Sequence, residues 1–454
     1  MQGQDDRLSA ALRVASTTRA AVIAEGAIDA LPGVLCQAAP AARYLIVADA
    51  NTWKAAGVQV AARMAHGGLS TADPVVLEEL PRVKPVAATA RELAAVLKRG
   101  AALPIAVGSG VINDLVKYAA HLAGTSYVCV ATAASMDGYA ASGAALRDDG
   151  FKRTFACPAP AAIIADLDII AAAPSVMAGW GYGDLAGKVV AGADWMLADA
   201  LGEETLSPGP FALIQDNLDA WLGDPAGVRS GRRQALDGLV RGLIMSGLAM
   251  QAHGNSRPAS GSDHQFAHLW EMEEVAVASL PVSHGACVGI GCLSMLAAYE
   301  WLLAQDPLTI EPSACAARTP SAQRLRAEVA SAFPLAFMAA NAESETLAKA
   351  HGPDAVERRV MRLRAAWSGL AKDLRRRLPR ADAMRGKLEA AGAPSTAAAI
   401  GVSPARHARD YARARLIRRR YTALDLLADL GWLDAAVREL FGEEGFWAPS
   451  RAVA

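Results

Sequence analysis

LPIAVGSGVINDLVKYAAHLAG, the stretch from Leu103 to Gly124, decides the fold class of this 454-residue chain. It begins with a short apolar run, passes through the glycine turn 108–110, and continues with apolar residues at helical spacing. A continuous apolar run is typical of a strand buried on both faces, and a strand that leads directly into a helix is typical of a parallel sheet. The stretch therefore predicts one strand–helix unit of an α/β fold.

Three further apolar runs extend this pattern through the first third of the chain: RYLIVADANT (43–52), SYVCVATAAS (126–135) and AAIIADLDII (161–170). After Pro174 the pattern changes to long segments at helical period that are rich in Ala and Leu, such as SVMAGWGYGDLAGKVVAGADWMLADAL and RYTALDLLADLGWLDAAVRELFG. We therefore expect an α/β domain over residues 1–172 and an all-helical domain over residues 173–454. Gly, Pro and Ser in GAPSTAAAIGVSPARHARD predict a flexible connection there.

The composition indicates a globular protein of more than one domain. The formal net charge is −1 and 53% of the residues are hydrophobic. Six cysteines without metal-type spacing predict buried thiols in a reducing compartment. The N-terminus has acidic residues where a signal peptide needs positive charge, and the apolar run from Gly285 to Tyr299 is shorter than the roughly twenty residues of a membrane span. We read this run as a buried helix and expect a cytoplasmic protein.

Positive charge gathers in one region. Between His351 and Arg420 there are 18 Lys and Arg against 6 Asp and Glu. Such a region can bind nucleic acid, but here the arginines alternate with apolar residues at helical intervals. The pattern favours the solvent-exposed face of an amphipathic helix, and we expect no nucleic-acid partner.

The turn Gly108–Ser109–Gly110 is a candidate phosphate-binding loop. Glycines let backbone amides approach a phosphate, and the helix that follows adds positive potential at its N-terminus. Asn113 stands where the dinucleotide fingerprint has its third glycine, so a simple tight turn is an equal alternative. Asp49, at the end of an apolar strand, can accept bonds from ribose hydroxyls or can cap a helix.

Polar residues also follow the next strand, in ATAASMDGYAASGAAL. Thr132 and Ser135 stand where ligands of open α/β sheets gather. Asp137 and Gly138 taken alone favour a turn.

Histidines and a carboxylate lie in the helical part of the chain. Asp184 and Lys188 are four residues apart in GYGDLAGKVV, a spacing that an ordinary helical ion pair explains. His264 and His268 share a helix face in SGSDHQFAHLWEM, and His284 precedes the buried apolar run. One carboxylate and two imidazoles from separate helices can hold a divalent ion and leave coordination positions open for a substrate oxygen.

Together these segments resemble glycerol-1-phosphate dehydrogenases, which belong to the iron-containing alcohol dehydrogenase and dehydroquinate synthase-like superfamily. The motifs are VGSGVINDLVKYAA, ATAASMDGYAASGAAL, GYGDLAGKVVAGADWMLA, SRPASGSDHQFAHLWEM and SHGACVGIG. The likeness runs from about Arg43 to Leu303, and IRRRYTALDLLADLGWL resembles the bacterial branch. The resemblance implies a nucleotide-binding N-terminal domain, a metal- and substrate-binding helical domain, and an active site in the cleft between them.

The resemblance also implies an activity and a set of residues. The activity is reduction of dihydroxyacetone phosphate to sn-glycerol 1-phosphate with NAD(P)H and a divalent metal. The implied metal ligands are Asp184, His264 and His284, and the residues that act on the substrate are Asp137, Asp184 and His268. The implied cofactor residues are Asp49, Gly108, Ser109, Gly110, Asp114, Thr132 and Ser135.

The run before His264 adds a hypothesis about the substrate. Arg257, Ser260 and Ser262 are candidate donors to a substrate phosphate, because arginine forks and hydroxyls bind phosphate oxygens. The sequence departs from the family at Val111 and Ala141, where relatives often carry hydroxyl side chains.

Several alternatives stay open at this stage. A glycerol or polyol dehydrogenase of the same superfamily would share the fold, the metal and the cofactor but would not need Arg257. A dehydroquinate synthase-like lyase and a metal-binding scaffold without turnover are two others. Zinc, nickel and iron all suit the ligand set. Asp49 favours NAD over NADP, because its carboxylate would repel a 2′-phosphate. A homodimer is expected by resemblance.

Overall fold

A computed structural model describes residues 2–78, 82–148 and 151–448 of the chain. Contacts between Cα atoms divide it into two compact units. Unit 1 comprises Met1–Leu185, Ala212–Pro258 and Ala390–Gly392, and unit 2 comprises Ala186–Phe211, Ala259–Glu389 and Ala393–Ala454.

Unit 1 is built on a parallel six-stranded sheet in the order β1-β8-β5-β4-β2-β3. The strands are β1 (Ala20–Ala24), β2 (Tyr44–Asp49), β3 (Val75–Leu77), β4 (Leu103–Gly108), β5 (Val128–Ala131) and β8 (Ala162–Asp166). The four strands that the sequence predicts are present, and the predicted α/β class is confirmed. The two edge strands, β1 and β3, were not predicted from the sequence, although their residues AAVIA and VVL are apolar; they are less buried than the central strands.

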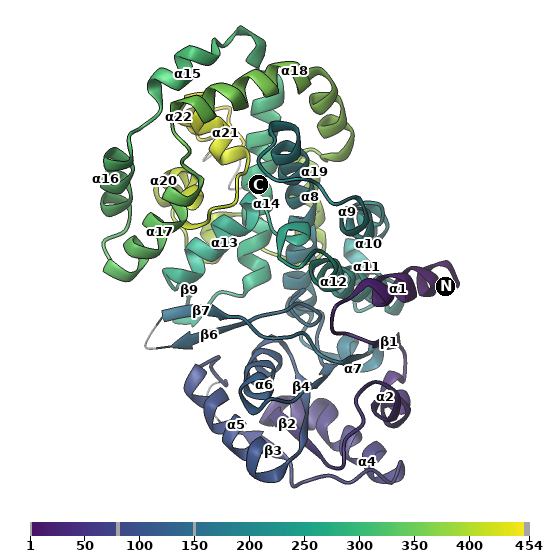
Figure 1. Ribbon diagram of the computed structural model, residues 1–454. Coiled ribbons are helices and arrows are strands. Elements are labelled where there is room, and N and C mark those ends of the chain that lie inside the picture. The colour runs from purple at the N-terminus through teal and green to yellow at the C-terminus, as the bar shows by residue number, and fades with distance from the viewer. Residues whose placement is uncertain (1, 79–81, 149–150, 449–454) are drawn as a thin grey trace. The chain divides into compact units, whose positions relative to one another are not determined.

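Helices cover both faces of this sheet. Figure 1 shows α5 and α6 on one side of the strands and α2 and α4 on the other. The helical segments around the sheet are α1 (Gln2–Val14), η1 (Ala27–Ala30), α2 (Leu31–Ala38), α3 (Ala50–Thr52), η2 (Trp53–Gly57), α4 (Val58–His66), α5 (Ala87–Gly100), α6 (Gly110–Ala123) and α7 (Leu167–Ala172). Ile46, Ile105 and Val130 of the strands are buried against Leu35 of α2 and Val60 of α4. Both faces of the sheet are therefore apolar, which explains the continuous hydrophobic runs.

The strand order changes direction at β2. The chain passes from β2 to β3 on one side, and β4 then pairs with the other side of β2. The carboxyl ends of β2, β4 and β5 are neighbours, since Val47 pairs with Ala106 and Gly108 pairs with Ala131. In open α/β sheets such a reversal leaves a crevice at the strand ends where ligands bind. An antiparallel hairpin, β6 (Ala144–Asp148) and β7 (Phe151–Phe155), follows β5.

Three more helices lie wholly in unit 1: α10 (Leu218–Trp221), α11 (Pro225–Arg229) and α12 (Arg233–His253). Helix α9 (Pro208–Gln215) is divided between the two units at Ala212. Unit 1 therefore includes helices that follow residue 172, where the secondary structure changes. A domain boundary at residue 172 therefore remains a prediction.

Helix α8 (Ser175–Leu201) is the longest helix of the described chain and crosses the limit between the units without a break. Its first part packs closely in unit 1, because a Cβ on Gly181 would lie 2.0 Å from the carbonyl oxygen of Ala134. Glycine is needed there for the helix to approach the loop after β5. Its later part packs in unit 2, where a Cβ on Gly187 would lie 2.4 Å from Oδ2 of Asp263.

Unit 2 is helical around α13 (Ser262–Met272) and α14 (His284–Ala304). Its other helical segments are η3 (Arg257–Ala259), which spans the unit limit, η4 (Pro307–Thr309), α15 (Pro312–Arg318), α16 (Ala322–Ala332), α17 (Ala336–Lys349), α18 (Pro353–Arg377), α19 (Ala381–Ala390), η5 (Ala397–Ile400), α20 (Pro404–Ala414), η6 (Arg415–Ile417), α21 (Ala423–Asp429) and α22 (Leu433–Leu440). Two short strands, β9 (Ala276–Val277) and β10 (Leu280–Pro281), form a hairpin between α13 and α14.

Helix α14 is long and apolar enough to cross a membrane by length and composition, but 83% of the residues in that window are buried within the protein. The prediction of a buried helix agrees with this placement. The helix is longer than the predicted apolar run, since it continues through Glu300 and Trp301 to Ala304.

One smaller expectation is wrong, one holds only in part, and one predicted helical stretch is divided. The Gly-, Pro- and Ser-rich segment near residue 400 is η5 and α20, with Ile400 and Tyr411 buried, because Thr396 and Ser403 cap these helices. The final periodic stretch is two helices, since Gly431 has a positive φ of 71° and ends the first. Cys36 is exposed, whereas the other cysteines are buried; all six are free thiols.

Candidate active site

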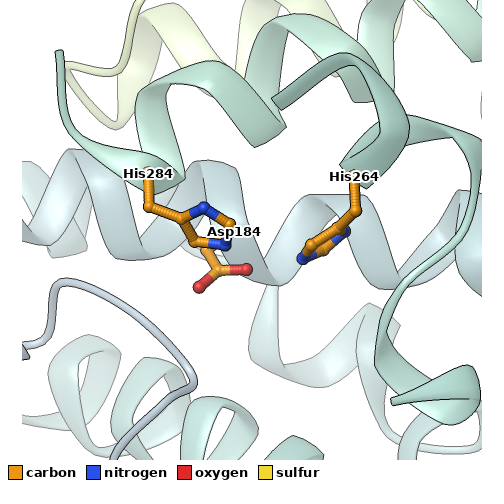
Figure 2. A group of neighbouring side chains, drawn as sticks. All are labelled: Asp184, His264 and His284. Carbon is orange, nitrogen blue, oxygen red and sulfur yellow. The ribbon is translucent and has the colours of Figure 1, made fainter. Parts of the chain in front are cut away.

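Asp184, His264 and His284 come from three different helices, α8, α13 and α14, and point toward one another (Figure 2). Each offers one ligand atom, and these atoms all lie within 4.8 Å of one another. Asp184 is fully buried and His264 nearly so. A carboxylate and two imidazoles at this spacing form a donor set that suits a divalent transition metal.

Close helix packing brings these ligands together. Gly291 of α14 faces the backbone of α13, where a Cβ would lie 2.3 Å from the carbonyl oxygen of Asp263. Gly187 of α8 faces the carboxylate of the same residue. Small residues at both positions let α8 and α14 approach the first turn of α13, which carries His264.

Two carboxylates orient the histidines. Nδ1 of His264 is hydrogen-bonded to Oδ2 of the buried Asp263, and Nδ1 of His284 lies 3.0 Å from Oε1 of Glu271. An imidazole that donates its Nδ1 proton to a carboxylate presents the lone pair of Nε2. The residues present therefore fit a metal ion, because both imidazoles have the carboxylate partner that metal-binding histidines commonly have.

Asp194, which lies on α8 beyond Asp184, fixes the start of α13. Its Oδ2 accepts hydrogen bonds of 2.6 Å from both the backbone amide and the hydroxyl of Ser262. Its Oδ1 accepts from the hydroxyl of Tyr299 at 2.7 Å and from the amide of Ala423 at 2.9 Å. A fully buried carboxylate with four donors ties α8, α13, α14 and the segment before α21 together.

His268 lies beside the two histidine ligands, with ring centroids 5.8 Å from those of both His264 and His284. Nη2 of Arg418 is 2.8 Å from its Nδ1. Burial lowers the pKa of His268 well below its usual value, and the positive charge of Arg418 lowers it further. Because a guanidinium only donates, Nδ1 is the acceptor, and the neutral ring carries its proton on Nε2.

Asp137 is hydrogen-bonded to the side chain of Asp184 through its backbone amide. The amide of Asp137 donates to Oδ2 of Asp184 at 2.8 Å. The loop that carries Asp137 is held by Lys117, a buried side chain whose Nζ donates to the carbonyl oxygens of Gly138, Ala141 and Gly143 at 2.9 to 3.0 Å. The sequence pattern gave no sign of this lysine, because its partners are backbone atoms distant in the chain.

The candidate cofactor residues lie at the carboxyl ends of the central strands of unit 1. Asp49 ends β2 and Gly108 ends β4, next to the point where the strand order reverses. Oδ1 of Asp49 caps α3 by accepting from the amides of Asn51 and Thr52. Its Oδ2 accepts no hydrogen bond from residues of the described chain, so the cap leaves one oxygen for a ribose hydroxyl.

The glycine turn leads directly into α6, with Ser109 at the N-cap and no side-chain cap. Gly110 is packed under Met136, since a Cβ there would lie 2.8 Å from the sulfur atom. Thr132 and Ser135 follow β5, and the hydroxyl of Ser135 is 3.2 Å from that of Tyr139. These residues share one edge of the sheet with Asp49, as the sequence predicts; their contact with a cofactor stays a prediction.

Asp114 has internal partners. Its Oδ2 accepts from the amide of Ala145 at 3.1 Å, and its Oδ1 accepts from Asn113 at 3.3 Å. These bonds join α6 to β6. A role in cofactor binding is still a prediction for this residue, and the structure gives it a second role in holding the hairpin.

The run before His264 is largely engaged within the protein. Arg257 is fully buried, and the hydroxyl of Ser262 donates to Asp194. The carbonyl oxygen of Ser260 accepts from Nη1 of Arg420 at 2.6 Å. Binding of a substrate phosphate by Arg257 remains a prediction, whereas the Ser262 hydroxyl already has a carboxylate acceptor.

Comparison with known proteins identifies the family of this chain. Residues 22–174 match the iron-containing alcohol dehydrogenase family. Glycerol-1-phosphate dehydrogenase [NAD(P)+] from Bacillus velezensis is 34% identical over 273 residues, which are 59% of this chain and 68% of that protein. The enzyme of the same name from Bacillus subtilis is 34% identical over 58% of this chain and 67% of its own length. The chain belongs to the glycerol-1-phosphate dehydrogenase family.

Solved structures agree with this family at the level of fold. Glycerol dehydrogenase from Schizosaccharomyces pombe aligns with a TM-score of 0.59 at 15% identity, over 93% of this chain and 90% of that one. Sulfoacetaldehyde reductase from Bifidobacterium kashiwanohense, solved in complex with NAD+, aligns with a TM-score of 0.55 at 13% identity, over 93% and 96%. An α/β sheet domain followed by helices is therefore the shared architecture.

For this family member, the sequence pattern did not point to three polar residues near the ligands. Glu271 follows His268 by three residues, so helical spacing alone would have placed it near the histidine face, whereas Asp263 directly precedes His264 and the spacing does not place it there. Arg418 lies 150 residues from its partner His268, and no sequence periodicity signals that contact.

Proposed function

We propose that this protein reduces dihydroxyacetone phosphate to sn-glycerol 1-phosphate with a nicotinamide cofactor and one divalent metal. The observation that carries the proposal is the convergence of Asp184, His264 and His284. The family relationship at 34% identity supports the substrate and the cofactor class. In this proposal Asp184, His264 and His284 hold the metal, and the strand ends that carry Asp49 and Gly108 hold the cofactor.

When bound, the metal supplies a Lewis acid toward the substrate oxygen and the reduced nicotinamide supplies a hydride for the carbonyl carbon. The surrounding residues keep the ligands in one protonation state. Asp263 and Glu271 hold the Nδ1 protons of His264 and His284, so that Nε2 of each ring stays unprotonated. Asp137 fixes Oδ2 of Asp184 through its amide.

His268 is a hydrogen-bond donor in this mechanism. Its Nε2–H donates a hydrogen bond to the substrate oxygen and stabilises negative charge there, and the proton that completes the alcohol comes from solvent. The guanidinium of Arg418 at Nδ1 opposes a second proton on the ring, so a neutral donor is present at neutral pH. Asp137 and Asp184 contact the substrate in this proposal.

The finer points of the proposal follow the same residues. The carboxylate of Asp49 favours NAD over NADP, because it would repel a 2′-phosphate. Zinc, nickel or iron suits the ligand set. We also propose that the protein works in the cytoplasm as a homodimer and without a nucleic-acid partner.

The test is NADH oxidation by the purified, metal-loaded protein with dihydroxyacetone phosphate or unphosphorylated dihydroxyacetone. We expect a strong preference for the phosphate ester and a loss of both activity and bound metal in His264→Ala. The matched control is His351→Ala, which removes an exposed histidine and should retain metal and activity. Equal or reversed preference would assign the protein to the polyol dehydrogenases.

A further inference from the structure

Arg418 differs from the arginines of the basic C-terminal region that are paired with carboxylates. Five of them form ion pairs with carboxylates at 2.9 Å or less: Arg359 with Asp429, Arg406 and Arg413 with Glu273, Arg415 with Glu328, and Arg419 with Glu345. For Arg418, no carboxylate of the described residues lies within 4.0 Å; its hydrogen-bond partner is Nδ1 of His268.

Arg418 is also partly withdrawn from water. Its side chain lines a narrow hollow, too tight for a water molecule as the side chains stand, together with Ser260, Gly261, Gln265, His268 and Arg420. Burial lowers the pKa of Arg418, and the carboxylates of Glu345 and Glu271 oppose this from a distance. A guanidinium remains charged in proteins. A partly buried guanidinium without a carboxylate partner therefore favours the binding of an anion.

The wall of this hollow is rigid. Arg420 donates from Nη1 to the carbonyl oxygen of Ser260 at 2.6 Å, and Nε2 of Gln265 donates to the carbonyl oxygen of Arg420 at 3.2 Å. The hydroxyl of Thr422 reaches Oε1 of the same glutamine at 3.2 Å. The segment after η6 is thus joined to α13 by bonds that do not use Arg418, which leaves its charge available.

The hollow adjoins the chemistry proposed above. His268 is one of its walls, and the ring of His268 is 5.8 Å from that of the metal-binding candidate His264. One guanidinium nitrogen of Arg418 contacts His268, and the remaining donors of the fork suit two phosphate oxygens. A ligand that contacts both His268 and Arg418 must therefore be small, with its reacting oxygen close to its anionic group.

We propose that Arg418, with Arg420 beside it, binds the phosphate group of the substrate and so selects phosphorylated three-carbon ketones. This inference rests on the proposed function and names the side chain that gives it substrate selectivity. It adds to Arg257 a candidate that is only partly buried instead of fully enclosed. Unphosphorylated dihydroxyacetone would leave the guanidinium without an anion.

The experiment compares Arg418→Gln with Arg419→Gln, its neighbour in the chain, which is exposed and paired with Glu345. For Arg418→Gln we expect kcat/KM for dihydroxyacetone phosphate to fall roughly 10- to 100-fold, because a charged hydrogen bond is lost. We expect kcat/KM for dihydroxyacetone to fall by a clearly smaller factor, because that substrate feels the change only through the contact of Arg418 with His268. Arg419→Gln should behave as the parent protein, and Arg418→Lys should recover part of the phosphate preference.

A binding measurement keeps this inference separate from the proposed reaction. Inorganic phosphate should raise the thermal midpoint of the parent protein and of Arg419→Gln but not that of Arg418→Gln. If both substrates lose kcat/KM equally in Arg418→Gln, the arginine only positions His268 and the inference is overturned. If the parent protein reduces neither ketone but phosphate still protects it through Arg418, the phosphate site stands and the proposed reaction fails.

Discussion

Asp263 and Glu271 matter at the scale of single residues because each fixes where an imidazole proton resides. A neutral imidazole can carry its proton on either nitrogen, and only the unprotonated nitrogen can bind a metal. The carboxylate at Nδ1 of His264 settles that choice in favour of a free Nε2. The identity of the side chain before His264 therefore affects metal binding without contacting the metal.

Asp263→Asn tests this dependence. Oδ1 of the amide can still accept from the Gly261 amide, as Asp263 does at 3.0 Å, but its Nδ2 then faces Nδ1 of His264 as a second donor. The His264 proton should shift to Nε2, and metal affinity should fall about 10- to 100-fold. Competition with a chelator measures the affinity.

The matched control for that variant is Asp219→Asn, an exposed carboxylate on α10. It should bind metal as the parent protein does. Equal affinity of Asp263→Asn and the parent protein, alongside lost binding in His264→Ala, would show that the carboxylate does not orient the ligand.

At the scale of helices, contact between α13 and α14 depends on a glycine. Gly291 has no room for a side chain, because the obstructing atom is the backbone oxygen of Asp263, which cannot rotate away. We expect Gly291→Ala to lower the free energy of unfolding by about 1 to 3 kcal/mol and to weaken metal binding through His264. Urea unfolding and chelator competition measure the two effects.

Gly369 on α18 provides the opposite case for the same substitution. It is exposed, and a Cβ there would meet nothing within 4 Å. Alanine at this helical position should raise the free energy of unfolding by about 0.5 to 1 kcal/mol. Equal effects of Gly291→Ala and Gly369→Ala would contradict close contact between α13 and α14 at Asp263.

The elements also show what could be predicted from sequence. Continuous apolar runs predicted β2, β4, β5 and β8, because a strand buried on both faces must be apolar throughout. The edge strands β1 and β3 were missed although they are apolar, because the runs AAVIA and VVL are short and the apolar stretch alone does not separate a strand from a helix. Gly- and Ser-rich sequence near residue 400 suggested a linker, whereas capping by Thr396 and Ser403 made it helical.

The candidate site was predictable to a similar extent. The motifs named Asp184, His264 and His284, which come together in the structure. Single-sequence reasoning could not pair Arg418 with His268, because contacts across 150 residues leave no local pattern. Nor could it show that Ser262 is already bonded to Asp194.

At the scale of the whole molecule, charge is balanced by distant partners. The basic region has an excess of arginines, yet several of them are paired with carboxylates that lie outside it, such as Glu273, Glu328 and Glu345. Isolated ion pairs of this kind add little stability when exposed. Their main effect here is to match the basic region to the rest of the chain, which holds 27 Lys and Arg against 40 Asp and Glu, so that the whole chain carries a formal net charge of −1.

His407 affects the stability of the whole protein through pH. It is buried on α20 among the rings of Phe266, Trp270, Phe441 and Trp447. Its Nε2 lies 2.8 Å from the hydroxyl of Ser294, which itself donates to the carbonyl oxygen of Ile290, so Nε2 carries the ring proton and donates it. Burial lowers the pKa of His407 to about 3.

This lowered pKa has a defined consequence for stability. Below the usual histidine pKa of about 6.5, the unfolded chain binds a proton that the folded protein does not, so the free energy of unfolding falls as the pH decreases toward about 3. The loss at about pH 5 is about 2 kcal/mol relative to neutral pH. His407→Gln keeps an N–H donor for Ser294 but cannot ionise, and should lose less stability over this range than the parent protein. Urea unfolding at several pH values, with the exposed His351→Gln as control, measures the difference, and parallel losses in parent and His407→Gln would show that His407 accepts its proton equally in both states.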